Sequence, residues 1–163
     1  MKWIKRSALQ LVGALCLAAA GPALAATEHQ HEHGHGAAAT TLQLNAGQKW
    51  ETDAALRLAM GNIRRTMAAA LHEIHEDRLS AKGYGRLAHQ VESEVGNIVA
   101  NCKLTAAADA QLHVVVAELL AGAEQMAGKA KGGKRQRGAV QVIGALEKYA
   151  SHFDDPGFKP IAH

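Results

Sequence analysis

Apolar residues recur at helical spacing in four stretches of the chain, and this pattern limits the fold more than any other feature. Side chains at positions i, i+3, i+4 and i+7 share one face of a helix, so each stretch predicts an amphipathic helix. Only 4% of the residues are aromatic, which disfavours a β-sandwich. We therefore predict an all-α fold, an up-down-up-down four-helix bundle with short connections. The expected helices cover residues 52–78, 81–102, 106–127 and 136–153.

Polar residues at the expected helix starts support these boundaries. Thr52 or Asp53, then Ser80, then Thr105 precede the first three apolar stripes, and such side chains cap helix N-termini. Pro156 follows the fourth stripe, where a proline ends a helix.

The first 25 residues carry the features of an export signal. Three basic residues lie within the first six, an apolar stretch follows, and residues 21–25 end in the small-x-small pattern that signal peptidase accepts. The apolar run is shorter than a membrane span. We expect a signal peptide at residues 1–25, cleavage after Ala25 or alternatively Ala26, and a periplasmic protein that does not insert into the membrane after cleavage.

The rest of the chain then divides into a His-rich flexible tail at 26–48, the bundle at 49–155 and a C-terminal extension at 156–163. The tail has no large apolar residue before Leu42, so it cannot bury a face by itself.

Four histidines alternate with other residues inside the expected tail, within a stretch of seven. Several imidazoles within reach of one ion suit Cu(II), Zn(II) and Ni(II), and nearby carboxylates add oxygen ligands. A plain spacer is the alternative, but spacers are normally built from Gly, Ser, Pro or charged residues. The sequence therefore predicts copper or zinc capture. The expected metal ligands are His29, His31, His33, His35, Glu28 and Glu32.

Further potential ligands lie within the predicted helices. His72 and Glu76 are one turn apart, but they lie on the polar face of their helix and His75 lies at the edge of its apolar stripe. His113 follows an aspartate by one turn, which favours a structural hydrogen bond. Cys102 is the one cysteine that remains after signal cleavage, and it is either a soft metal ligand or a small core residue. These five residues are secondary metal candidates.

The connection between the third and fourth expected helices is rich in glycine and basic residues. Residues 129–137 could dock an acidic protein partner or form a solvated connector. Loss of the signal removes three of the 18 basic residues and leaves 15 to balance the 15 acidic ones, so nucleic acid is not an expected partner. The pattern brings together no catalytic triad and no phosphate-binding glycine loop, and we expect no enzymatic activity. It leaves the oligomeric state open.

Three segments of the chain form a distinctive set. They are Lys49-Trp50-x-Thr52-Asp53-x-x-Leu56-Arg57-x-x-Met60-x-x-Ile63-Arg64, Ile98-Val99-Ala100-Asn101-Cys102-Lys103-Leu104 with Ala108-Asp109-Ala110-x-Leu112-His113, and His152-Phe153-Asp154-x-Pro156-Gly157-Phe158-Lys159-Pro160. These segments resemble the exported bacterial proteins labelled DnrO. Together with the His-rich tail, the resemblance covers nearly the whole mature chain and supports its segment boundaries.

The predicted bundle is also similar to the architecture of cytochrome b562 and cytochrome c′. Met60 and His152 lie near the places of the methionine and histidine ligands of cytochrome b562. The resemblance implies non-covalent binding of haem b and electron transfer as an alternative function. Two features depart from it: the chain has no C-x-x-C-H motif for covalent attachment, and His152 lies away from the apolar stripe of its helix. A metal-independent interaction module is a further alternative.

Overall fold

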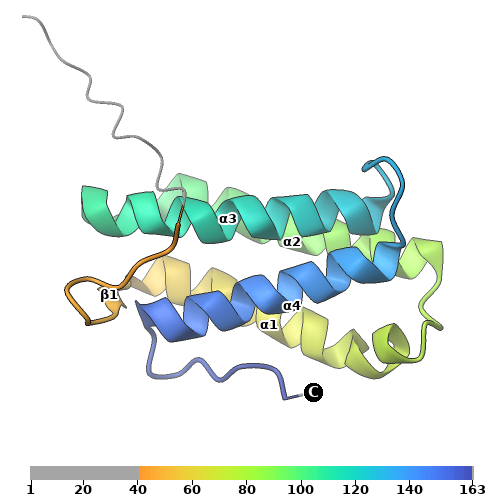
Figure 1. Cartoon of the computed structure of the whole chain (residues 1–163), viewed down its shortest axis with the longest axis horizontal. Helices are drawn as coiled ribbons and strands as arrows, with labels where there is room; N and C mark the ends of the chain where they lie inside the picture. Colours follow the sequence, from red (N-terminus) through yellow and green to blue (C-terminus); the bar gives the residue numbers. More distant parts are fainter. Residues whose placement is uncertain (1–40, 163) are drawn as a thin grey trace, which may run out of the picture. The chain divides into compact units, whose positions relative to one another are not determined.

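The computed structural model describes residues 41–162, and these residues form four α-helices with two short strands (Figure 1). The fold is therefore all-α, as predicted, and each helix lies within three residues of its expected bounds. The expected signal peptide and residues 26–40 of the expected tail lie outside the described residues. The elements are β1 Trp50–Glu51, α1 Ala54–His75, α2 Ala81–Asn101, α3 Ala106–Ala127, α4 Arg135–His152 and β2 Phe153–Asp154.

Side-chain caps begin the first three helices at predicted positions. Asp53 Oδ1 accepts from the N–H of Leu56 at 2.7 Å, Ser80 Oγ caps α2 and Thr105 Oγ1 caps α3. Each cap satisfies one of the backbone donors that a helix leaves without an internal partner. Of the alternatives Thr52 and Asp53, the structure selects Asp53.

Helix α1 ends at His75, earlier than the predicted residue 78. Asp77 adopts the left-handed conformation, with φ of +50°, directly after the C-cap residue Glu76. The N–H of Arg78 then bonds to the carbonyl of Glu73 across this turn at 2.9 Å. A left-handed residue closes a helix in this way, so α1 ends one residue after Ile74, the last residue of its apolar stripe.

The four helices lie side by side around one apolar core (Figure 1). Helix α3 packs against α4 and α2, and α1 packs against α2 and α4. The thioethers of Met60, Met67 and Met126 are completely buried in this core, together with leucine, isoleucine and valine side chains from all four helices. Flexible methionine side chains fill irregular gaps between such neighbours.

Two glycines allow α3 and α4 to approach at backbone distance. A Cβ atom on Gly138 would lie 2.5 Å from the carbonyl oxygen of Gly122 and 2.7 Å from the amide nitrogen of Met126. A Cβ on Gly122 would in turn lie 2.7 Å from the carbonyl oxygen of Gly138. Since these contacts are with backbone atoms, no side-chain rotation could relieve them. Any side chain at either position would push the two helices apart.

Residues 42–53 run across the helices instead of ending a flexible tail. Strand β1 pairs with β2 in parallel, Trp50 opposite Phe153, and Lys49 Nζ donates to the carbonyl of Ala150 at 2.7 Å. The N–H of Gln43 donates to Gln111 Oε1 on α3. Within the expected tail, Gln43 thus contacts α3, and the neighbouring Lys49 contacts α4, through long-range hydrogen bonds.

The C-terminal extension also packs back onto the helices. Ile161 is buried, and the Phe158 ring meets the ring of Tyr149 edge to face, with 5.0 Å between centroids. The ring of Tyr149 stacks on Phe153, and its hydroxyl donates to Asp155 Oδ2 at 3.0 Å. These aromatic contacts attach the end of the chain to α4.

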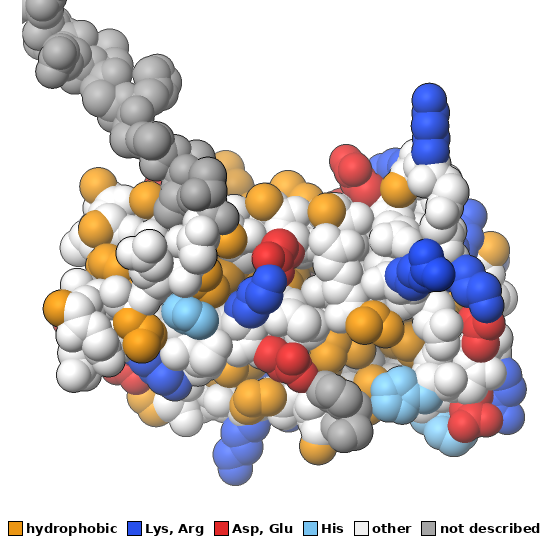
Figure 2. All heavy atoms as spheres, viewed as in Figure 1, with side chains coloured by type: hydrophobic (Ala, Val, Ile, Leu, Met, Phe, Trp, Pro, Cys, Tyr) orange, Lys and Arg blue, Asp and Glu red, His pale blue; other side chains and the backbone are white. Residues whose placement is uncertain are grey.

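Helix α3 is the one helix among residues 41–162 that is long and apolar enough to cross a membrane by length and composition. Its inner face packs on α2 and α4, and hydrophobic side chains also appear along the edge over α3 in Figure 2. A core helix of a helical protein meets the same two criteria.

We predict that Gly138→Ala lowers the free energy of unfolding by about 1–3 kcal/mol, because the new methyl group overlaps α3 backbone atoms. Gly144→Ala is the matched control on the same helix. An added Cβ there meets nothing within 4 Å, so this change should stabilise the protein by about 0.5–1 kcal/mol. Urea unfolding of both variants tests the pair, and equal effects would contradict the close crossing.

Candidate functional site

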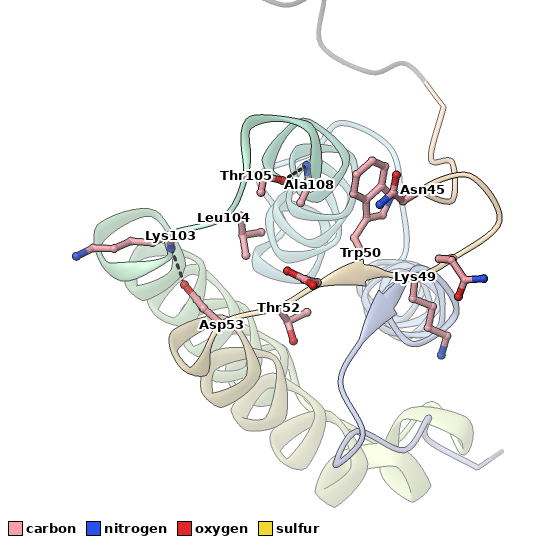
Figure 3. A pocket seen from close by; sticks show the side chains of 11 residues that line it. Asn45, Lys49, Trp50, Thr52, Asp53, Lys103, Leu104, Thr105 and Ala108 are labelled. Atoms are coloured by element: carbon pink, nitrogen blue, oxygen red, sulfur yellow. Dashed lines mark hydrogen bonds between the residues drawn. The ribbon is translucent and has the colours of Figure 1, made fainter.

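The link between α2 and α3, residues 102–105, lies between two cavities. The larger has a volume of about 370 Å³ and lies among the start of α3, the turn at residues 45–48 and strand β1 (Figure 3). The smaller, of about 240 Å³, lies between α2 and α3. Asp53 lines the larger cavity and Cys102 the smaller, and these two residues contact each other.

Asp53 joins the start of α1 to the α2–α3 link. Its Oδ1 atom caps α1 through Leu56, and its Oδ2 atom accepts from the N–H of Lys103 at 2.5 Å. Burial opposes ionisation of this carboxyl group, but the two backbone donors, the Cys102 thiol and the charge of Arg57 outweigh it and hold the pKa of Asp53 below its usual value. One carboxylate therefore fixes two chain segments that are 50 residues apart.

Burial and the same carboxylate together keep the Cys102 thiol protonated. Burial raises the pKa of Cys102 to about 11, and the charge of Asp53, its hydrogen bond with the thiol and the charge of Asp109 add to this effect. The thiolate is the form that attacks electrophiles and binds metals. At neutral pH Cys102 is accordingly a neutral side chain whose reactivity its neighbours suppress.

The smaller cavity brings together two of the secondary metal candidates. Cys102 and His113 both line it, with Asp109 beside them and the apolar side chains of Ile98 and Leu112 in its wall. His113 Nδ1 lies 2.8 Å from the backbone carbonyl oxygen of Asp109 and 3.4 Å from its carboxylate, so the ring contacts the preceding turn of its own helix. Among residues 41–162, no group of three or more His, Cys, Asp or Glu side chains has an arrangement that could hold a metal ion.

The larger cavity has mixed chemistry. Figure 3 shows the Trp50 ring near Asn45, while the side chains of Lys49 and Lys103 extend outward on different sides. The Trp50 indole N–H donates to the carbonyl of Gln43 at 2.6 Å. The polar groups that line the larger cavity therefore serve mainly to hold the segment before α1 in place.

The other secondary candidates lie near the opposite end of α1. His72 and His75 are in its last turn and Glu76 is its C-cap residue, and all three are exposed. His72 Nε2 lies 2.9 Å from Nη2 of Arg78. The structure thus separates these three residues from Cys102 and His113 by the length of a 22-residue helix.

The two residues of the haem alternative differ strongly in environment. Met60 is fully buried in the core, whereas His152 is half-buried at the end of α4. His152 Nδ1 lies 2.9 Å from the carbonyl oxygen of Lys148 and 2.9 Å from Ser151 Oγ, so the ring contacts its own helix. Neither residue lines either cavity at the α2–α3 link.

Several cations of the predicted docking segment contact groups of the chain itself. Lys129 pairs with Glu92 at 3.1 Å, Lys134 lies 3.8 Å from Asp77, and Arg135 donates to the carbonyl of Met126 at 2.6 Å. Lys131 and Arg137 are exposed. Figure 2 shows Lys and Arg side chains gathered near this α3–α4 connection. Gly128, with φ of +76°, ends α3 before it.

Sequence reasoning missed one residue with unusual surroundings, Glu94. It is the one charged residue that is buried among residues 41–162, with 6% of its surface exposed. The signal was present in the sequence, because Glu94 lies at helical spacing from Leu87, Val91 and Ile98 in the apolar stripe of α2.

No family model, no curated protein and no solved structure matches this chain. The resemblances to DnrO proteins and to cytochrome b562 therefore stay predictions.

We predict that Asp53→Asn accelerates alkylation of Cys102. Asparagine keeps one acceptor oxygen for the helix cap, while burial of the thiol is unchanged, so loss of the neighbouring negative charge lowers the pKa of the thiol and increases the thiolate fraction at pH 8. Iodoacetamide labelling followed by peptide mass spectrometry measures the rate at Cys102 itself. Glu51→Gln, which removes an exposed carboxylate from the same cavity wall, is the control and should leave the rate unchanged.

We also predict that Cys102 makes the protein less stable in alkali. A raised pKa means that the folded state still holds the proton when the unfolded thiol, with a pKa near 9.0, has lost it. The resulting stability is present below pH 9.0 and is lost as the pH rises through about 11. Urea unfolding at several pH values should show that Cys102→Ala removes part of this alkaline loss, about 1 kcal/mol once solvent screening of the partly exposed thiol is allowed for. Parallel pH curves for the two proteins would refute the assignment.

Proposed function

We propose that this protein is an exported, periplasmic transition-metal-binding protein that captures copper or zinc through its His-rich segment. The observation that carries the proposal is the alternation of His29, His31, His33 and His35, with Glu28 and Glu32 beside them. These residues lie outside the described residues, and their chemistry supports the proposal. Neutral imidazoles are ligands for both ions, and closely spaced ones on one peptide can bind the same ion.

Features of the helical domain support a different role for it than metal binding, which we assign to the His-rich segment. The Cys102 thiol has its pKa raised to about 11, so a metal ion would have to displace a tightly held proton. The sulfur atoms of Met60, Met67 and Met126 are buried in the core. We assign capture of the ion to the segment and a carrier or docking role to the helices.

The architecture that we propose for the carrier is the up-down-up-down bundle. Helices that are neighbours in sequence are also neighbours in space, and α1 closes the set by packing on α4. Asn62, in the first half of α1, bonds to Glu94, in the second half of α2, as antiparallel neighbours require. The proposed signal peptide at residues 1–25 precedes this unit.

We predict that replacing the four histidines at 29, 31, 33 and 35 with asparagine weakens binding of Cu(II) and Zn(II) by more than about tenfold. Isothermal titration of the full chain and of this variant measures the difference. Binding should also weaken below about pH 6, because protonated imidazole cannot ligate a metal.

The matched control replaces His72 and His75, which are exposed on α1, with asparagine. It removes two imidazoles from the chain and should leave the affinity unchanged. Equal affinities in all three proteins would contradict the assignment to the segment, and a loss confined to the control would move the site to α1.

A further inference from the structure

The buried carboxylate of Glu94 faces the groove between α1 and α2, and all of its hydrogen-bond partners are neutral. Its Oε1 atom accepts from Asn62 Nδ2 at 3.1 Å and from Gln90 Nε2 at 2.9 Å, and its Oε2 atom accepts from Asn97 Nδ2 at 3.2 Å. Among residues 41–162, no ion pair joins Glu94 to a basic side chain. Arg65 donates to the side chain of Asn62, so its contact with the carboxylate of Glu94 is indirect, through Asn62.

This arrangement leaves a buried negative charge without a counter-ion. Removing a carboxylate from water is costly, and amide donors recover only part of that cost because they carry no net charge. Buried charges in proteins are normally paired with an opposite charge. Three donors also leave at least one lone-pair direction of the carboxylate for a further hydrogen bond. A cation that reached Glu94 would gain both the charge pairing and this bond.

A cavity of about 330 Å³ provides access to the carboxylate. The residues that line it come from α1 and α2. On each helix they lie three or four positions apart or next to such positions, so they share one helix face. Leu58, at the exposed side of the groove, has 64% of its surface in contact with solvent, while Glu94 lies deep between the helices. The lining residues are Ala55, Leu58, Ala59, Asn62, Glu94, Asn97 and Asn101.

The chemistry of this lining selects an organic cation over a metal ion. Calcium takes six or more oxygen ligands, and the amide groups of Asn62 and Asn97 direct their NH2 donors toward Glu94. The alanine and leucine walls offer no ligands, but they suit the carbon chain of an amine. The geometry points to a binding site for a primary ammonium or guanidinium group on a short aliphatic chain, with Glu94 as its counter-ion.

A purely structural role for Glu94 is the competing explanation, since the Asn62–Glu94 bond also joins α1 to α2. The variant Glu94→Gln separates the two roles. It keeps the size of the side chain and one acceptor oxygen, removes the charge, and replaces the other oxygen with an NH2 donor. The variant Glu73→Gln removes an exposed carboxylate from α1 and is the matched control.

Titration of the isotope-labelled full chain tests the site, with the side-chain amide signals of Asn62, Gln90 and Asn97 as reporters. The probes are n-butylamine, agmatine and Nα-acetyl-lysine amide, with n-butanol as the uncharged analogue. We expect the three cations, but not butanol, to shift these signals. Glu94→Gln should weaken the response about ten- to a hundredfold, and Glu73→Gln should not change it.

Comparison of the probes identifies the source of the cation. Tighter binding of Nα-acetyl-lysine amide than of n-butylamine would assign the site to a lysine side chain of a protein partner. The reverse order would assign it to a free amine. Unchanged amide signals at millimolar amine, equal binding by Glu94→Gln, or a response to Mg²⁺ or Ca²⁺ but not to the amines would each overturn the proposal. The outcome is independent of the metal titrations of the His-rich segment.

Discussion

The close crossing of α3 and α4 at Gly122 and Gly138 sets the position of the chain's C-terminal third. A Cβ on Gly138 would approach the carbonyl oxygen of Gly122 to 2.5 Å, so the distance between these helices depends on the absence of two side chains. Helix α4 then places β2 directly after it, and β2 pairs with β1. The Thr52 hydroxyl completes this connection by donating to the carbonyl of Asp154 at 2.6 Å. The start of α1 is thereby fixed against the end of α4.

Asp53 fixes the start of α1 against a second part of the domain, the link between α2 and α3. It follows β1 in the chain, caps α1 and accepts from the N–H of Lys103, so a single carboxylate connects α1 to the link between α2 and α3. Burial raises the pKa of Cys102, and the charge of Asp53 raises it further, so that the thiol stays protonated. A structural contact thus contributes to the chemistry of the one cysteine among the described residues.

The two proposed activities use different physical principles at different places in the chain. Capture of a transition metal would rely on several imidazoles along a short stretch of sequence, so it needs little tertiary structure. Binding of an organic cation would rely on one carboxylate that the packing of α1 and α2 removes from water. The first was visible in the sequence. The second was missed in the sequence. Glu94 lies at helical spacing within the apolar stripe of α2, but it was not recognised there as a buried charged residue.

The sequence by itself determined the four helices and three of their caps, because helical period and capping are local properties of neighbouring residues. It did not determine the end of α1, where Asp77 takes a left-handed conformation, or the attachment of residues 42–48. Only the tertiary structure decided that Asp53 meets Lys103 and Cys102, that Cys102 and His113 share a cavity, and that Glu94 faces three amides. These contacts join residues on different elements, so they depend on how the helices pack and not on the spacing of residues along any one of them.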